Sequence, residues 1–238
     1  MTEAIIALVV LVLGWFGVGS ALNVRRGNAA LKWLQGGLKQ LGDKATVKWV
    51  GTTAVQLGLA QAKTPFEEAV VVIFLEPRDL PWLWALSRSR GRRDTLILRG
   101  RLAKPPVEDL ELLDRASWSG RDAFRGMKEE RWSVREPAAP ESLPAFYKFE
   151  NALARAEALG AAARQAGANV RRLSVRRSEP HLQLHVDLPA ASVDAAGFFR
   201  TVRDLGELAG KREAPADVRR YVVAAAGFGA AGCAEYFW

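Results

Sequence analysis

The residues best suited to chemistry lie on one short segment, where both histidines of the chain alternate with aliphatic residues. His181, Gln183, His185 and Asp187 follow one another at every second position. Residues two apart share a face of a β-strand, so these side chains should line one side of a strand. His181, His185 and Asp187 are therefore the candidate catalytic residues, and they would suit a hydrolase or transferase that acts on a phosphorylated substrate.

The preceding segment adds arginines to the same face. Residues 169–177 and 181–188 alternate in the same way, with a turn expected at 178–180, which predicts an antiparallel hairpin. Arg172 and Arg176 would then point to the polar side. The planar guanidinium group donates two hydrogen bonds at once to phosphate. Two interpretations stay open: an anion-binding surface at these arginines, or an ordinary amphipathic hairpin with one solvated face.

No metal or cofactor is expected. His181 and His185 would lie about 13 Å apart along a strand, too far to share one ion. The single cysteine, Cys233, has no neighbouring histidine in the sequence. The chain lacks the phosphate-loop, zinc-binding and nucleophile motifs GxxxxGK[ST], HExxH and GxSxG. Its one GxGxxG spacing, at 227–232, has no strand expected before it, so a dinucleotide-binding loop is not predicted there. The sequence therefore favours a non-catalytic protein without excluding an enzyme.

A second group of residues places tryptophans beside arginines. Trp82 and Trp84 precede a cluster of four cations: Arg88, Arg90, Arg92 and Arg93. Tryptophan prefers the headgroup depth of a bilayer and arginine binds lipid phosphate, so the segment suits a membrane interface. Two alternatives remain. The tryptophans could face a core ahead of a solvated basic loop, or the group could bind nucleic acid by base stacking.

The position of these groups depends on the first segment of the chain. Ala4–Val24 contains no charged residue and is followed directly by Arg25 and Arg26. Its 21 residues would form a helix of about 31 Å, close to the roughly 30 Å of a bilayer core. This predicts a transmembrane helix over 1–24. A cleaved signal peptide is the alternative, and the acidic Glu3 in place of a basic first region argues against it.

The charges that follow the apolar segment predict its orientation. The cations after it outnumber the single acid, Asp43: they are Arg25, Arg26, Lys32, Lys39, Lys44 and Lys48. Cations remain on the cytoplasmic side, so the N-terminus should lie outside and the bulk of the chain in the cytoplasm, at the cell (inner) membrane. Arg25, Arg26 and Trp33 are expected at the membrane interface. The net charge of +8 suits an anionic leaflet, and nucleic acid is the less favoured polyanion.

The remaining pattern predicts an α+β fold in which antiparallel hairpins are packed by helices. The expected helices cover 28–41, 145–166, 192–209 and a segment from Pro215, and strands are expected within 45–60, 69–75, 95–102 and 130–135. Three proline residues mark 137–144 as a linker. It would separate a basic α+β domain, 25–136, from an α-β-β-α domain, 145–238, with an apolar C-terminal tail.

The leading functional hypothesis is a single-pass, membrane-anchored accessory or scaffold protein. Its basic cytoplasmic region would bind anionic lipid or another membrane protein or complex. The alternatives are the membrane-bound hydrolase or transferase described above and a membrane tether for nucleic acid.

Overall fold

The computed structural model describes residues 1–137 and 142–212, and its centre is one antiparallel β-sheet. Nine strands are hydrogen-bonded in the order β1-β2-β3-β4-β9-β8-β5-β7-β6. Their bounds are β1 Gly42–Val50, β2 Ala54–Ala62, β3 Phe66–Phe74, β4 Thr95–Leu102, β5 Leu110–Leu113, β6 Ser133–Arg135, β7 Ala145–Tyr147, β8 Val170–Val175 and β9 Leu182–Asp187. The α+β class expected from the sequence is confirmed, and the expected hairpin is β8–β9.

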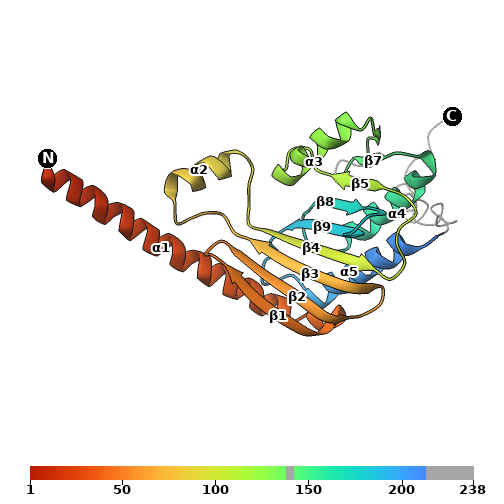
Figure 1. Ribbon diagram of the computed structural model, residues 1–238, viewed down its shortest axis with the longest axis horizontal. Coiled ribbons are helices and arrows are strands. Elements are labelled where there is room, and N and C mark those ends of the chain that lie inside the picture. The colour runs from red at the N-terminus through yellow and green to blue at the C-terminus, as the bar shows by residue number, and fades with distance from the viewer. Residues whose placement is uncertain (138–141, 213–238) are drawn as a thin grey trace, which may run out of the picture.

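The first helix is longer than the sequence pattern suggests. α1 runs without a break from Thr2 to Gln35, so the predicted separate helix over 28–41 is its continuation, followed by one 3-10 turn at Leu38–Gln40. Its first half projects away from the rest of the molecule (Figure 1). Its second half packs against the folded part through six buried residues: Gly19, Asn23, Gly27, Ala30, Trp33 and Leu34.

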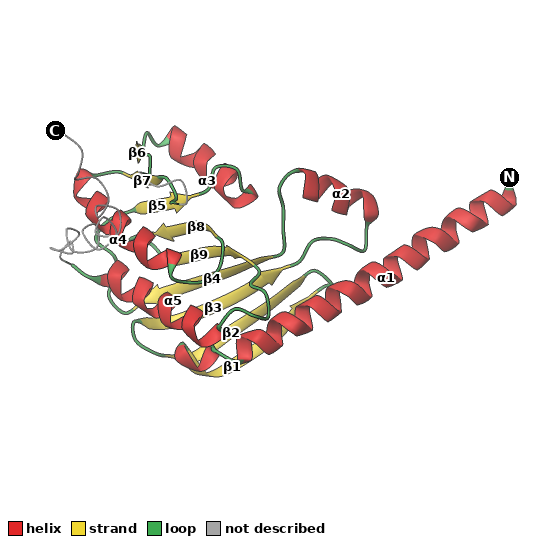
Figure 2. Ribbon diagram, turned by 180° about the vertical axis from the view of Figure 1, so that it is seen from behind, coloured by secondary structure: helices red, strands yellow, loops and turns green. Residues whose placement is uncertain are grey.

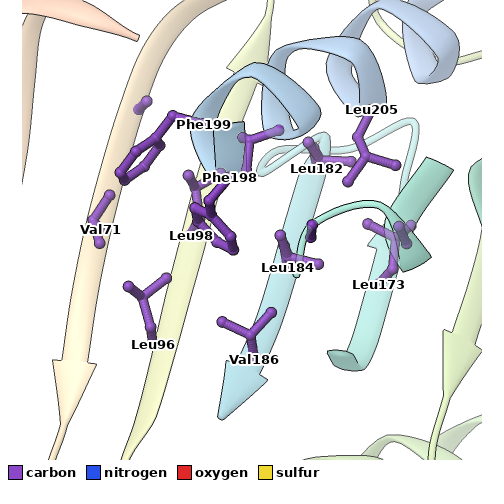
Figure 3. Close-up of a cluster of buried hydrophobic side chains, with 14 of the residues drawn as sticks. Val71, Leu96, Leu98, Leu173, Leu182, Leu184, Val186, Phe198, Phe199 and Leu205 are labelled. Atoms are coloured by element: carbon purple, nitrogen blue, oxygen red, sulfur yellow. The ribbon is translucent and has the colours of Figure 1, made fainter. Parts of the chain in front are cut away.

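The main core lies between one face of the sheet and two helices. α4 (Leu153–Arg164) and α5 (Ala195–Gly210) cover this face, as Figure 2 shows. Strand alternation sends Leu98 and Leu184 toward α5, where Phe198 and Phe199 meet them (Figure 3). The two phenylalanine rings pack edge to face, with centroids 5.1 Å apart. Because successive strand residues point to opposite faces, the burial of this apolar layer places the alternate, polar residues on the other face of the sheet.

Two short helices lie away from that core. α3 (Trp118–Glu129) packs on the other face of the sheet, where Met127 joins Leu113 and Phe146 in a small apolar cluster. α2 (Pro81–Ser89) is inserted between β3 and β4, and Figure 1 shows it beside the middle of α1. Its position makes α2 the part of the folded region nearest to the exposed half of the apolar helix.

Several boundaries differ from the sequence predictions for local reasons. The helix expected from 145 begins only at Leu153, because Ala145–Tyr147 pairs with both β5 and β6 as strand β7. α5 is capped by Asp194 rather than Ser192, since the Asp194 carboxylate accepts the backbone N–H groups of Ala196 and Gly197. The helix expected from Pro215 and the apolar tail lie outside the described residues.

Strands from both predicted domains belong to the same sheet. β4, from the predicted 25–136 domain, pairs with β9, and β5 pairs with β7 and β8 from the predicted 145–238 domain. The segment predicted as a linker, 137–144, therefore connects neighbouring strands β6 and β7. A buried ion pair also ties the two parts together: the Arg155 Nε of α4 donates to Glu108 over 2.8 Å.

Candidate functional site

A buried carboxylate, Asp94, ties the middle of α1 to the start of β4. Its Oδ1 accepts hydrogen bonds from Arg78 Nη1 at 2.9 Å and from the Glu76 backbone N–H at 2.8 Å. Its Oδ2 accepts from Arg26 Nη1 and Arg78 Nη2, both at 2.9 Å. Burial alone would raise the pKa of Asp94, but the bonds and charges of Arg78, with Arg26, outweigh it and lower the pKa. Asp94 therefore stays ionised and holds α1 in place.

The neighbouring carboxylate of Glu76 binds the inward face of α2. It is almost fully buried and accepts Trp84 Nε1 at 2.5 Å and Arg88 Nη1 at 3.2 Å. Arg88 also lies over the Trp84 ring, 5.8 Å from its centroid. Trp84 was expected at the membrane interface and Arg88 at an anion site. The structure pairs both with Glu76, and Arg88 remains about half exposed beside an open cleft.

An open cleft of about 560 Å³ lies beside this network, between α1 and the ends of the central strands β4 and β9. Its walls include Arg26, Trp33, Arg88 and Arg93. Trp33, expected at the membrane interface, is buried: its Nε1 donates to the Val193 carbonyl at 2.7 Å and its ring packs on Phe198. Burial against α5 removes Trp33 from any lipid contact, whereas Arg25 and Arg26 remain exposed on α1.

The two arginines predicted to bind an anion already hold one inside the protein. Glu111 of β5 is 0% exposed and accepts Arg172 Nε and Nη2, both at 2.8 Å. Its Oε1 also accepts Arg176 Nη2 and Ser174 Oγ, both at 2.7 Å. Burial would raise the pKa of Glu111, but these bonds and charges outweigh it and lower the pKa. The polar face predicted for β8–β9 exists, and Glu111 neutralises part of it.

Of the candidate catalytic residues, His185 and Asp187 line one small cavity, whereas His181 is engaged elsewhere. His181 Nδ1 accepts the backbone N–H of Leu102 at 3.0 Å, which assigns this histidine to the end of β4. Asp187 binds Arg171 through two bonds, from Nε at 2.9 Å and from Nη2 at 2.7 Å. His185 is 5% exposed, and neither ring nitrogen has a hydrogen-bond partner within the described residues. Burial, with the charge of Arg172, lowers the pKa of His185 to about 4.

A small cavity of about 90 Å³ adjoins His185. Trp118, Arg92, Arg93 and Asp187 also line it. Among residues 1–137 and 142–212, no three His, Cys, Asp or Glu side chains lie close enough together to hold a metal ion. The cavity thus offers a neutral imidazole beside cations and one carboxylate, Asp187, which is already paired with Arg171.

The remaining predicted residues stay at the surface around α2. Trp82 is exposed, Arg92 lies 5.6 Å from the centre of the Trp118 ring, and Arg93 donates to the carbonyls of Arg88 and Arg92. Within the described part of the chain, none of Arg90, Arg92 and Arg93 forms a salt bridge to a carboxylate. These three arginines keep their charge available, unlike Arg172 and Arg176.

The sequence interpretation missed the acids that organise the site. Glu76 follows the apolar run of β3 and Glu111 sits within Leu110–Leu113, so a lone acid in or beside an apolar strand was the available signal. Such a residue is rarely buried unless it is paired. The buried Asn23, whose Oδ1 accepts Arg78 Nη1 at 3.1 Å, was likewise hidden within the apolar segment of α1.

Gly19 should be essential for the contact between α1 and the segment before α2. A Cβ at Gly19 would overlap the backbone of Arg78 and Asp79, whereas a Cβ at Gly17 meets no atom within 4 Å. We expect Gly19→Val to lower the free energy of unfolding by about 1–3 kcal/mol through overpacking. Gly17→Val is the matched control, since both changes alter helix propensity alike. Urea unfolding of the full chain in mild detergent measures the difference, and equal values for the two variants would contradict the contact.

Comparison with known proteins assigns this chain to no family. No family model matches the sequence, and no curated protein matches it significantly. The structure defines an α+β protein with one nine-stranded antiparallel sheet and one N-terminal helix that is long and apolar enough to cross a membrane. That helix is compatible with a membrane anchor or with a signal sequence.

Proposed function

We propose that this chain is a single-pass, membrane-anchored accessory or scaffold protein rather than an enzyme. Its folded region lies on the cytoplasmic side of the cell membrane and binds anionic lipid or a partner membrane complex. One observation carries the proposal: the exposed apolar half of α1 and the second half, which packs one side on the folded region, form one continuous helix. The anchor therefore ends inside the folded region, which is held directly against the bilayer.

The contacts of α1 favour an anchor over a cleaved signal. The small residues over 17–21 are where a signal peptidase would cut. Gly19 packs there against Arg78, and Trp15 Nε1 donates to the Arg78 carbonyl at 3.0 Å. Cleavage would remove these contacts and leave the pairing of Asn23 and Arg26 with Arg78 and Asp94 at a new chain end. Because α1 contacts the folded region on both sides of the possible cleavage site, it is better explained as a helix that the mature protein keeps.

The internal use of the polar side chains supports a role without catalysis. Asp187 is bound by Arg171, His181 accepts from a backbone N–H, and Glu111 occupies Arg172 and Arg176. A phosphorylated substrate would have to displace a buried carboxylate to reach those two arginines. The cations that stay available, Arg90, Arg92 and Arg93, surround α2 and suit a charged surface better than a closed active site.

Membrane integration and topology test the proposal in the full-length chain. We expect the protein to stay in the membrane pellet after an alkaline carbonate wash and to keep its N-terminal residues by mass spectrometry. Leu11→Arg, which places a charge in the apolar segment, should weaken insertion, while the conservative Leu11→Ala should not. A charged residue at the bilayer centre costs about 2.5–3.5 kcal/mol on insertion scales.

Orientation is measured by thiol labelling of intact cells. On a Cys233→Ser background, Glu3→Cys should react with a membrane-impermeant reagent and Asp204→Cys should react only after lysis. Carbonate extraction of the protein, or loss of residues 1–21 from the mature chain, would overturn the anchor. The reverse labelling pattern would overturn the cytoplasmic assignment.

A further inference from the structure

α2 presents a contiguous apolar face to the outside of the protein. Trp82 is 60% exposed, Leu83 39% and Leu86 46%. Positions three and four apart lie on one side of a helix, so Leu86 is next to both of the others. The opposite side is held inward, because Trp84 donates to Glu76 and Ser87 is buried. The exposed face is therefore fixed in direction by the packing of its back.

The segment that leads into α2 is bound to the apolar half of α1. The Arg78 carbonyl accepts from Trp15, and the backbone of Arg78 and Asp79 packs directly on Gly19. Pro81, two residues after Asp79, starts α2. Figure 1 accordingly shows α2 beside the middle of α1, with the first half of α1 extending beyond it. The exposed face of α2 is therefore held beside the apolar segment of α1, near Trp15 and Gly19.

The folded region first contacts α1 at a level inside the apolar segment, before that segment is long enough to cross a bilayer, while Leu22 and Val24 beyond this level remain exposed. Between the charged Glu3 and the Gly19 contact, Ala4–Val18 would cover about 22 Å at roughly 1.5 Å per residue. The hydrocarbon core of a bilayer is about 30 Å thick. The shortfall of about 8 Å matches the depth, roughly 5–10 Å, at which an interfacial amphipathic helix is buried. If the anchor spans the bilayer, the beginning of α2 lies in the same leaflet as Trp15.

The charges beside this apolar face complement an anionic lipid surface. Arg90 directly follows α2, and Arg92 and Arg93 continue the turn. Each cation held near an anionic leaflet contributes about 1 kcal/mol. A bilayer can contact the apolar face of α2 and its arginines only if they lie beside the apolar segment of α1. A partner protein could bind such a face anywhere on the molecule.

We propose that α2 is a second membrane contact, in which Trp82, Leu83 and Leu86 insert into the leaflet next to the folded region while Arg90, Arg92 and Arg93 bind the phosphates of anionic lipids. The inference rests on the proposed anchoring by α1. It adds that the chain meets the bilayer at two places, so that the orientation of the sheet relative to the membrane is fixed.

Environment-sensitive labels on the full chain test both contacts separately. The Cys233→Ser protein carries one new cysteine at a time, labelled with nitrobenzoxadiazole and reconstituted in phosphatidylcholine–phosphatidylglycerol vesicles. Leu83→Cys and Leu86→Cys report on α2. Val10→Cys reports on the anchor, and Asp204→Cys, on the exposed side of α5, is the aqueous control. Quenching by lipids with a shallow or a deep spin label gives the depth of each probe.

We expect the probes at 83 and 86 to be quenched several-fold more by the shallow spin label than the probe at 204, and the probe at 10 to be quenched by the deep one. Quenching at 10 without quenching at 83 and 86 would overturn the α2 contact and leave the anchor intact. A blue-shifted but unquenched signal at 83 and 86 would mean that a protein surface covers α2, which also overturns the inference. No quenching at 10 would refute the anchor itself.

The arginine part of the inference has its own control. In vesicles of phosphatidylcholine alone, the shallow quenching at 83 and 86 should fall. The choline cation balances the phosphate in each headgroup, so the membrane surface has no net negative charge to attract the arginines. Unchanged quenching would overturn the role of Arg90, Arg92 and Arg93. Thermal unfolding of each labelled protein shows that the fold is intact, and all of the probe positions are exposed.

Discussion

Replacing Glu111 by Gln is expected to lower the free energy of unfolding by about 3–5 kcal/mol. Glu111 is 0% exposed and is the shared partner of Arg172, Arg176 and Ser174. Gln keeps the shape and one acceptor oxygen, but it removes the charge and turns one oxygen into an NH₂ group that faces guanidinium donors. Two partly buried cations are then left beside each other without a counter-charge.

Chemical unfolding of the full chain in mild detergent measures this loss. Glu67→Gln is the matched control: Glu67 is half-exposed at 49% and lies 3.5 Å from Arg101, so its loss should cost no more than about 1 kcal/mol. A Glu111→Gln protein as stable as the control would show that Glu111 is not the internal partner of the arginines. That result would also return Arg172 and Arg176 to the list of candidate anion ligands.

Acidification is expected to destabilise the protein through His185 at pH values where most carboxylates are still ionised. The pKa of His185 is about 4 in the folded protein against 6.5 in the unfolded chain. Below about pH 6.5 the unfolded chain gains a proton that the folded protein does not accept. Stability is therefore complete above about pH 6.5 and declines as the pH falls toward 4. The total loss is about 3 kcal/mol, of which about 2 kcal/mol falls between pH 7.5 and 5.

His185→Gln should remove this part of the pH dependence. Gln fits a polar, buried position and does not titrate in this range. Between about pH 7.5 and 5, the free energy of unfolding of the variant should therefore fall by about 2 kcal/mol less than that of the unsubstituted protein. The effect of Glu111 is separable. Its pKa is lowered in the folded protein, so its contribution to stability is lost only below about pH 4.5, the ordinary pKa of a glutamate. In the folded protein the His185 ring should give the NMR shifts of a neutral imidazole down to about pH 5. An imidazolium signal at pH 6 would contradict the burial of this side chain.

These two residues lie on the same sheet face, where the polar groups are largely engaged with one another. Glu111 pairs with Arg172 and Arg176, and burial, with the charge of Arg172, lowers the pKa of His185 and keeps it uncharged. Arg172 and Arg176 are thus occupied by Glu111, whereas Arg25 and the arginines around α2 that follow Arg88 form no salt bridge to a carboxylate within the described residues. On our proposal, the binding surface lies around α2 and α1 rather than on the hairpin, where the sequence pattern pointed most clearly.

The β8–β9 hairpin shows what the pattern of the sequence can predict. Alternation correctly places Arg172, Gln183 and His185 on one face, because a β-strand has a period of two whatever surrounds it. The strand over 95–102 was predicted with its correct bounds for the same reason. Neither the partner strand β5 nor its Glu111 could be inferred, because that pairing joins segments about 60 residues apart and leaves no local periodic signal.

Trp84 of α2 and Trp33 of α1 show the corresponding limit of the sequence pattern. Tryptophan is suited both to a lipid interface and to a core with a hydrogen-bond acceptor nearby. Glu76 and the Val193 carbonyl provide those acceptors for Trp84 and Trp33, and only the folded chain brings them together. Trp82, two positions from Trp84, is left exposed because helix geometry turns it to the other side of α2.

The sequence by itself determined that an uncharged segment of membrane length precedes a basic α+β region, because hydrophobicity, charge and strand alternation are local properties. The tertiary structure decided which charges are available. It placed Glu111 against Arg172 and Arg176, Glu76 against Trp84, and Asp94 against Arg26 and Arg78. Electrostatic pairing depends on distances between segments remote in sequence and on the burial that strengthens it, and both exist only once the sheet has formed.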